Sequence, residues 1–441
     1  MAFVDALLAS TTDATVALVD CNGQPGGHWI DAYSFVSLHE PAVWYGVPST
    51  VLNTTEMAPD KLANKADILK YYKRVVNDVF VPSGRVHVLF DCRFQDGAVQ
   101  NICTGEKIQI DVCRSVVDTS YGKIQVPSKR APPFHIAAGV QVVPLNDITQ
   151  IDMRQYQTYV VVGAGKSSMD AITCMLGNGI KAEQVVWVRP RESWITPRDM
   201  MDSQQYPLFV KGTLEALVEA ETVDDAFKLM ESRGLRYRID QSTTPMLHKG
   251  ATLTMQELTL LRKVTDVITG KGRIRSIEND RIIFEHDERV MDSANTLYVD
   301  CAAYAYENSK SSQTVFSPAQ VTLQCYGSGG ACLDAARTAV VESLEDLSDE
   351  QKNLLCQPLP VLSPTTPEDW MLFHYDGLKM CNTWAEHPQL CEWLNTCRLN
   401  HSTHVPESVK SVHASSIKYL KDQFVCKMES GWEGLLNNRP A

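Results

Sequence analysis

The stretch TYVVVGAGKSSMDAITCMLGNGI, residues 158–180, decides the fold. It begins with an apolar run, Tyr159 to Val162, passes through two closely spaced glycines, and continues with apolar residues at helical spacing. The following segment, AEQVVWVRPRESW at 182–194, contains a second apolar run, Val185 to Val188. A strand, a glycine turn, a helix and a further strand are typical of a parallel α/β unit. We therefore predict an α/β fold.

The glycine turn fits the pattern Gly-x-Gly-x-x-[Gly/Ala] at Gly163 and Gly165, with Ser168 in the third position. The first glycine permits a tight turn, and the second lets the backbone approach a pyrophosphate at the positive end of the helix. Lys166 and Ser167 add a cation and a hydroxyl close to that charge. The segment is therefore predicted to bind a dinucleotide.

The end of the second strand distinguishes the two nicotinamide cofactors. An acid there binds the ribose hydroxyls of NADH, whereas an arginine accommodates the 2′-phosphate of NADPH. Arg189 ends the strand here, and Arg191 follows two residues later. The alternative is that both arginines only solvate the end of the strand. We predict NADPH.

The first residues, MAFVDALLASTTDATVALVDCNGQPGGHW at 1–29, have the pattern of the second half of another such unit. Apolar residues at helical spacing are followed by a run of β-branched and apolar residues, Thr15 to Val19, and then by Asp20. The acid of such a unit follows its glycine turn by about 20 residues, so counting back from Asp20 reaches or passes Met1. Two explanations stay open: the polypeptide is shortened at its start, or this site has lost its phosphate cradle.

Composition excludes several functional classes. A chain of 441 residues is long enough for two or three lobes. The formal net charge of −12 disfavours nucleic-acid binding, which needs clustered Lys and Arg. No segment approaches the ~18 consecutive apolar residues of a membrane span, and Asp5 lies where a signal peptide would be apolar. We expect a cytoplasmic protein that binds neither nucleic acid nor membranes.

The cysteines and histidines do not form a metal-binding pattern. The thirteen cysteines are scattered, as expected of reduced thiols. Zinc modules usually pair ligands about two to four residues apart, and the sequence contains no Cys-x-x-Cys. One C-terminal cluster keeps zinc open as an alternative: Cys381, His387, Cys391, Cys397, His401 and His404. We predict that no metal is bound.

Four motifs carry a resemblance to a known family: PGGHWIDAYSFVSLHEPAVWYGV at 25–47, VVVGAGKSSMDA at 160–171, VRPRESW at 188–194 and LYVDCAA at 297–303. Over about residues 2–345 the chain resembles the flavin-containing monooxygenase-like branch of the FAD- and NAD(P)-binding pyridine nucleotide oxidoreductases. The resemblance implies two Rossmann-like dinucleotide-binding domains, a discontinuous FAD domain with an NADPH domain inserted in it. The expected ranges are 1–148 and 296–345 for the two parts of the FAD-binding-like domain, 149–295 for the NADPH-binding domain, and 346–441 for a helical C-terminal extension.

The resemblance also implies roles for individual residues. On the FAD side it assigns the adenosine ribose to Asp20 and the loop along the flavin to Gly26, Gly27, His28 and Trp29. Nearer the isoalloxazine it places His39, with Tyr33 and Tyr45, although such aromatic residues often belong to a core. On the NADPH side it assigns the phosphates to Gly163, Gly165, Ser167 and Ser168, and the 2′-phosphate to Arg189 and Arg191.

The chain departs from the family pattern in three places, one of which is the Ala-Thr-Gly linker position that reads Cys301-Ala302-Ala303 here. No glycine motif precedes Asp20, so FAD binding is conditional on that missing motif. The monooxygenase signature Phe-x-Gly-x-x-x-His is replaced by PPFHIAAGVQVVPLNDI at 132–148. Oxygen activation is therefore less firmly implied than hydride transfer.

The leading hypothesis is a flavin-dependent NADPH oxidoreductase, with monooxygenases among its relatives, that passes a hydride from NADPH to FAD and acts on a small-molecule substrate. The cofactors carry that chemistry, and the sequence singles out no catalytic residue. Disulfide-reductase chemistry is disfavoured, because it needs a dithiol pair that the sequence lacks. Two alternatives stay open: a degenerate, non-catalytic relative with an incomplete flavin site, and a flavin-free NADPH reductase.

Overall fold

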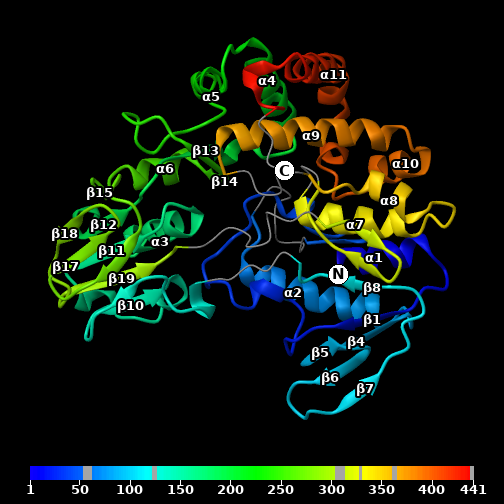
Figure 1. Cartoon of the computed structure of the whole chain (residues 1–441), viewed down its shortest axis with the longest axis horizontal. Helices are drawn as coiled ribbons and strands as arrows, with labels where there is room; N and C mark the ends of the chain where they lie inside the picture. Colours follow the sequence, from blue (N-terminus) through cyan, green and yellow to red (C-terminus); the bar gives the residue numbers. More distant parts are fainter. Residues whose placement is uncertain (53–61, 122–126, 303–312, 327–329, 360–364, 438–441) are drawn as a thin grey trace.

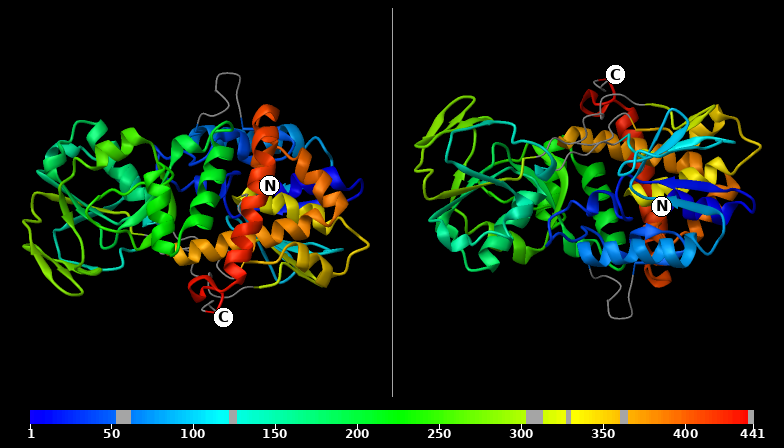
Figure 2. Two further views of the ribbon diagram at one scale, coloured as in Figure 1. Left: turned by 90° about the horizontal axis from the view of Figure 1, so that it is seen from above. Right: turned by 90° about the horizontal axis from the view of Figure 1, so that it is seen from below.

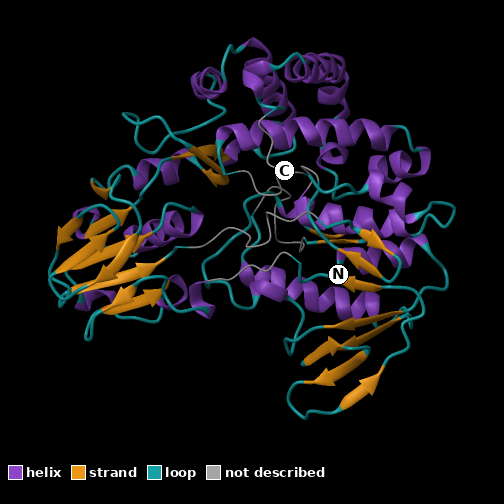
Figure 3. Cartoon of the chain, in the orientation of Figure 1, coloured by secondary structure: helices purple, strands orange, loops and turns teal. Residues whose placement is uncertain are grey.

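The computed structural model describes residues 1–52, 62–121, 127–302, 313–326, 330–359 and 365–437. Ala303, the last residue of the LYVDCAA motif, lies outside them. Figure 1 shows two lobes that contain sheets, joined along one side by long helices. Figure 3 shows the same division, with the strands gathered in the lobes and the helices between and above them.

The first lobe is built on a five-stranded parallel sheet with the strand order β10-β19-β11-β12-β15. Its strands are β10 (Gln141–Pro144), β11 (Thr158–Val162), β12 (Val185–Val188), β15 (Asp266–Ile268) and β19 (Thr296–Asp300). Helix α3 (Lys166–Gly177) connects β11 to β12, and α6 (Met255–Leu261) precedes β15. The predicted strand, glycine turn, helix and strand are confirmed. Two of the strands, β10 and β19, lie just outside the predicted range 149–295.

The middle of this sheet is buried on both faces. Tyr159, Val160 and Val161 of β11 have no exposed surface, and Met169 and Ile172 of α3 pack in the same lobe. A smaller sheet adds β9 (His135–Ile136), β16 (Ile274–Ile277), β17 (Arg281–Phe284) and β18 (Glu288–Val290). A continuous apolar run such as β11 is what a parallel strand covered on both sides requires.

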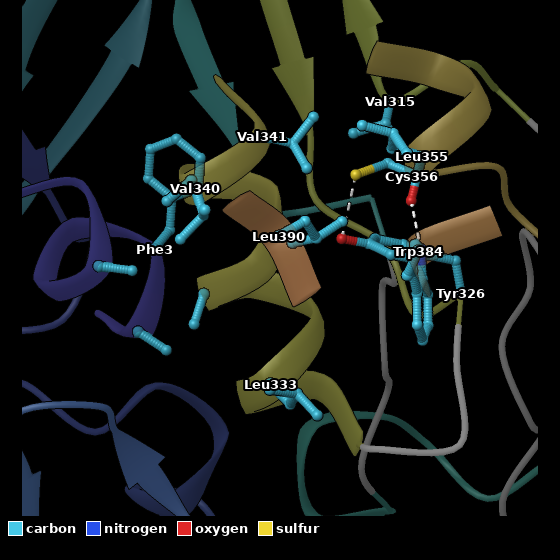
Figure 4. Packing of buried hydrophobic residues seen from close by; sticks show 14 of the residues in the cluster. Phe3, Val315, Tyr326, Leu333, Val340, Val341, Leu355, Cys356, Trp384 and Leu390 are labelled. Carbon is cyan, nitrogen blue, oxygen red and sulfur yellow. Dashed lines mark hydrogen bonds between the residues drawn. The ribbon is translucent and has the colours of Figure 1, made fainter. Parts of the chain in front are cut away.

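The second lobe contains the N-terminal residues. Helix α1 (Ala2–Ser10) is followed by β1 (Val16–Val19), which confirms the predicted helix and strand of residues 1–29. Strand β1 pairs in parallel with β4 (Val86–Leu89). Helix α1 packs on α7 (Gly330–Glu342), and Figure 4 shows Phe3 beside Val340 in that core. The same lobe contains α2 (Lys65–Val75), β2 (Gly46–Val47), β3 (Thr50–Val51), β5 (Cys92–Gln95), β6 (Ala98–Asn101), β7 (Lys107–Gln109), β8 (Val116–Asp118), β20 (Phe316–Ser317) and β21 (Gln320–Thr322).

Helices cover the junction between the lobes. They are α4 (Tyr206–Glu219), α5 (Val223–Ser232), α8 (Asp349–Leu355), α9 (Pro367–Ala385), α10 (Pro388–Thr396) and α11 (Glu407–Glu429). Figure 2 shows α11, in red, running across the helical layer on the side of the N-terminal lobe. The short pair β13 (Ser193–Pro197) and β14 (Leu247–Leu253) connects the layer to the first lobe. The predicted helical C-terminal part and the α/β class are confirmed.

The ends of α4 and α11 are joined by polar contacts. Lys427 of α11 donates hydrogen bonds to the carbonyl oxygens of Leu217 and Val218, at 2.8 and 3.1 Å, near the end of α4. A cation at the end of a helix satisfies carbonyl groups that have no partner within the helix. Among the described helices, none combines the length and the hydrophobicity that a membrane crossing needs.

Candidate functional site

The glycine turn and the two predicted arginines lie at the same edge of the five-stranded sheet. Strands β11 and β12 pair in parallel, with Tyr159 opposite Val185 and Val162 opposite Val188. The segments that follow the two strands are therefore neighbours. The carboxyl edge of a parallel sheet is where open α/β folds bind their ligands.

The two glycines of the turn serve different purposes. Gly163 has a φ of +138°, and a Cβ added there would lie 2.9 Å from the carbonyl oxygen of Cys301, which follows β19. Gly165 is the N-cap of α3, and a Cβ there would meet nothing within 4 Å. The first glycine is therefore required by the packing against β19. The second leaves open space at the helix N-terminus, where free amides can meet a pyrophosphate.

Ser168 and Ser167 follow in the first turn of α3. Ser168 has no exposed surface, and its hydroxyl donates a hydrogen bond to the carbonyl oxygen of Gly165 at 2.6 Å. A small buried residue at this position keeps the helix close to the strand. Ser167 is half-buried beside it. The serine at the third motif position thus holds the turn itself together.

Lys166 belongs to a network of charges around the first turn of α3. Its ammonium group pairs with Asp170 and lies 3.9 Å from Oε1 of Glu257 on α6. Oδ2 of Asp170 also accepts a hydrogen bond from the Tyr33 hydroxyl at 2.6 Å. Arg198 lies 3.0 Å from Glu257. Lys166, which was predicted to lie near the phosphates, therefore interacts with two carboxylates, those of Asp170 and Glu257.

The network joins the two lobes. Burial and the neighbouring Asp170 carboxylate raise the pKa of Tyr33 well above its ordinary value. Burial, and then the positive charge of Lys166, lower the pKa of His39 to about 4, so this imidazole is neutral at neutral pH. Tyr33 and His39 come from the FAD-side segment, whereas Lys166 and Asp170 begin the glycine helix. The structure thus brings residues of the two predicted sites together.

Arg189 has a partner of its own. It is 3% exposed, its Nε lies 2.8 Å from Oε1 of Glu192, and its guanidinium lies 4.5 Å from the centre of the Trp187 ring. Burial lowers its pKa, and Glu192 opposes that shift. Arg191 is exposed. Of the two predicted arginines, only Arg191 presents its charge on the surface.

A further cation beside Arg191 was not found from the sequence. The pKa of Lys249 on β14 is lowered, first by partial loss of water around its ammonium group and then by repulsion from Arg191 and Arg273. We refer to Arg191, Lys249 and Arg273 as the cation cluster. The three residues come from separate segments of the chain, so no spacing in the sequence points to the cluster.

The FAD-side residues at the start of the chain differ in whether protein atoms or open space lie next to them. Oδ1 of Asp20 accepts hydrogen bonds from the backbone N–H and the side-chain amide of Asn22, both at 2.9 Å. A Cβ on Gly26 would lie 2.5 Å from a methyl carbon of Leu69 on α2, whereas a Cβ on Gly27 would meet nothing within 4 Å. Gly26 has a φ of +148°, which strains any residue with a side chain, whereas the Leu69 methyl belongs to a flexible side chain that can move aside. Gly27 borders open space.

The aromatic residues of the same segment form part of a core. Trp29 is 8% exposed, and its indole N–H donates a hydrogen bond to the Tyr45 hydroxyl at 2.7 Å. The Tyr72 hydroxyl donates to the same oxygen at 3.1 Å. His28 is exposed and lies beside Trp29, with ring centres 5.3 Å apart. Trp29 and Tyr45 thus hydrogen-bond each other within the packed interior.

The C-terminal cysteines and histidines are dispersed among other contacts. His404 Nε2 lies 2.5 Å from the carbonyl oxygen of Arg398, and Cys397 is buried in a hydrophobic core. Among the described residues, no group of three or more histidines, cysteines or acids is close enough to hold a metal ion.

Comparisons with known proteins identify relatives and a shared fold. No family model matches the chain. The uncharacterized protein Rv2000 of Mycobacterium tuberculosis (strain ATCC 25618 / H37Rv) is 33% identical over 448 aligned positions, covering 96% of this chain and 81% of the relative. The uncharacterized protein Mb2023 of Mycobacterium bovis (strain ATCC BAA-935 / AF2122/97) has the same identity and coverage.

Among solved structures, an oxidized steroid monooxygenase bound to NADP is similar, with a TM-score of 0.50 and 12% identity, covering 98% of this chain and 96% of that one. A cyclohexanone-bound cyclohexanone monooxygenase in the Rotated conformation has a TM-score of 0.46 and 11% identity, covering 94% and 93%. The likeness to the first structure shows that the chain has a flavin monooxygenase-like FAD/NAD(P)-binding fold.

Proposed function

This chain belongs to the family of the mycobacterial proteins Rv2000 and Mb2023, and on that premise we propose that it is a flavin-dependent NADPH oxidoreductase acting on a small-molecule substrate. The fold supports this proposal, because it is that of enzymes that combine a flavin with a nicotinamide cofactor. Whether oxygen takes part is a further step of the proposal, since the monooxygenase signature is replaced in the sequence.

The observation that carries the proposal is the open space at Gly165. A methyl group there would meet nothing within 4 Å, at the point where the free amides of α3 face outward. This is the cradle that a dinucleotide pyrophosphate requires. We propose that Gly165 and the first turn of α3 hold the NADPH pyrophosphate.

We propose that the 2′-phosphate is held by the cation cluster. Arg191 and Lys249 would supply the charge, with Arg273 near them. Arg189 would act indirectly, because its ion pair with Glu192 fixes the backbone from which Arg191 projects. This assignment keeps the predicted preference for NADPH and transfers the contact from Arg189 to Arg191 and Lys249.

For FAD, the residues present supply part of a site. Asp20 lies at the end of β1, where such folds bind the adenosine ribose, and Gly27 borders open space along the expected flavin loop. When bound, NADPH supplies a hydride and FAD accepts it. The chain's own contribution is positional: the hydrogen bond from Tyr33 to Asp170 joins the two lobes, and the contact from Lys166 to Glu257 fixes α3 against α6. His39, neutral beside them, adds no charge to that junction at neutral pH.

The proposal is tested on the purified chain by its visible spectrum and by nucleotide binding. We expect flavin absorbance and tighter binding of NADPH than of NADH, measured by quenching of the nucleotide fluorescence. Anaerobic addition of NADPH should then bleach the flavin band. Colourless protein that still binds NADPH would support the flavin-free alternative. Colourless protein that binds neither nucleotide would support the degenerate relative.

A further inference from the structure

A buried arginine outside the nucleotide site has no acidic partner. Arg236 follows α5 and is 2% exposed. Its Nη1 donates to the carbonyl oxygen of Leu235 at 2.6 Å, while its Nε is buried without a partner. Among the described residues, no carboxylate forms an ion pair with it. Because an arginine stays protonated in proteins, the interior at this point contains an uncompensated positive charge.

Three aromatic rings surround the guanidinium. The centres of the Phe209, Phe227 and Trp370 rings lie 5.2, 5.9 and 4.8 Å from its central carbon. These rings attract a cation, but that attraction is weaker than the cost of burying an unpaired ion. The rings also offer no hydrogen-bond acceptor in their planes, so they leave the Nε–H of Arg236 without a partner.

His248 adds unsatisfied polar atoms in the same place. It is 4% exposed on β14, and both of its ring nitrogens are buried without a partner. Its ring centre lies 5.7 Å from that of Phe227 and 5.4 Å from that of Trp370, the same two rings that flank Arg236. A neutral imidazole has one N–H to donate. Arg236 and His248 therefore both have buried nitrogens without a partner beside the same two rings, and we refer to this place as the aromatic enclosure.

The charge of the enclosure can be counted. Burial lowers the pKa of Arg236 to about 9 and that of His374, which packs against Trp370, to about 3. Burial, and then repulsion by Arg236, also lower the pKa of His248 well below its ordinary value. At neutral pH both imidazoles are neutral and the arginine is charged. The enclosure has a single positive charge and N–H donors.

We propose that Arg236 and His248 bind one small monovalent anion of about the size of chloride at their unpaired nitrogens, beside the contacting rings of Phe227 and Trp370. A monovalent ion balances the single charge, and its size suits an enclosure whose two polar residues are almost fully buried. The residues come from α5 and its flank, from β14 and from α9. The bound anion would therefore stabilise the contact of the C-terminal helices with the rest of the chain. This site is independent of the nucleotide cofactors.

The test combines crystallography with thermal unfolding. Crystals of the full chain grown in bromide should show an anomalous peak beside Arg236 and His248. In solution, we expect the Tm to rise by about 2 °C when chloride replaces gluconate from about 5 mM to about 200 mM at constant ionic strength. Comparison with gluconate removes the effect of ionic strength. The change should be absent in Arg236→Met.

Two further variants keep the test decisive. Arg233→Met removes a partly exposed arginine that pairs with Glu219, and it should keep the full response to chloride. If Arg236→Met does not fold, His248→Gln should weaken the response while keeping a hydrogen-bonding side chain. A missing bromide peak, or a peak with the same Tm response in wild type and variant, would overturn the proposal. The second result would mean an adventitious ion only.

Discussion

The chain contains two segments of nucleotide-binding pattern, and they differ in what holds them together. At β11 and α3, strand, glycine turn and helix are continuous, and Gly163 contacts the backbone after β19 so closely that a side chain cannot fit. At the N-terminus, α1 and β1 are present, but their packing is against α7 and β4. The packing of the N-terminal segment does not depend on a glycine turn. Pyrophosphate binding in such folds does depend on one.

The comparison teaches that fold and binding can be carried by different residues of one motif. Gly163 is required by the Cys301 backbone beside it and Gly26 by its φ of +148°, whereas a Cβ on Gly165 or Gly27 would meet open space. In both segments, therefore, one glycine shapes the protein and another leaves room for a ligand.

Gly163→Ala should produce the largest loss of stability. The added Cβ would lie 2.9 Å from the Cys301 carbonyl oxygen, at a φ of +138°. We expect the free energy of unfolding to fall by about 4 kcal/mol, because backbone strain and a backbone clash combine. Gly27→Ala, at a φ of +54° with open space around the Cβ, should cost only about 1 kcal/mol. Urea unfolding measures both values, and equal losses would remove the distinction between the two glycines.

Glu192→Gln tests whether Arg189 is structural. The change leaves Arg189 charged and buried without its ion-pair partner, at positions only 4% and 5% exposed. We expect a loss of about 3 kcal/mol in the free energy of unfolding. The double variant Arg189→Met, Glu192→Met should recover most of that loss, because it removes both charges from the interior. If the single variant is as stable as wild type and binds NADPH much more weakly, Arg189 contacts the cofactor instead.

In the first segment, the sequence predicted those features that depend only on residues close together in the chain. Gly163, Gly165 and Ser168 lie within six residues of one another, and their spacing alone defines the turn. The apolar run of β11 likewise determines its buried place in the sheet. Even the ion pair of Arg189 had a local signal, since Glu192 follows three residues later in the same VRPRESW motif.

The rest of the site depends on contacts between distant segments. Lys249 is repelled by the charge of Arg191 across the pair of strands β13 and β14, and Lys166 meets Glu257 because α6 packs beside α3. No spacing in the sequence encodes such pairs, because the topology of the sheet and its connections brings them together. For a similar reason, the sequence did not show whether the aromatic residues of the N-terminal segment pack in a core or line a cofactor site. Trp29 and Tyr45 hydrogen-bond each other in the core, and the same residue types would also suit a cofactor site.

The double variant Arg191→Ala, Lys249→Ala should change cofactor choice with little effect on stability. Removal of two cations from the 2′-phosphate should raise the Kd for NADPH about 100-fold, or about 2.7 kcal/mol. The Kd for NADH should change by less than about twofold, since NADH lacks that phosphate. Titration of nucleotide fluorescence measures both constants. Arg275→Ala is the control for a nearby exposed cation, and equal losses for NADPH and NADH would remove the cation cluster from the site.

The smallest effect concerns Glu40, in the N-terminal segment beside His39. Burial raises the pKa of Glu40 from 4.5 to about 7, and His401, 3.8 Å away with a pKa of about 4, gives it no positive charge in that range. Tyr206 and Cys332 also face it, and both are neutral there because burial raises their pKa values to about 12 and about 11.

The pKa of Glu40 is 4.5 in the unfolded chain and about 7 in the folded chain, so between these pH values the folded chain binds more protons. The free energy of unfolding therefore falls as pH rises from 4.5 to about 7, and it stays lower at higher pH. Glu40→Gln stays neutral throughout. Its Tm should therefore exceed that of wild type by about 2 °C at about pH 8, and the difference should disappear near pH 4.5. Thermal unfolding across this range, with the exposed Glu183→Gln as control, measures the effect. A difference that does not depend on pH would mean that the Glu40 carboxyl titrates at the same pH in the folded and unfolded chains.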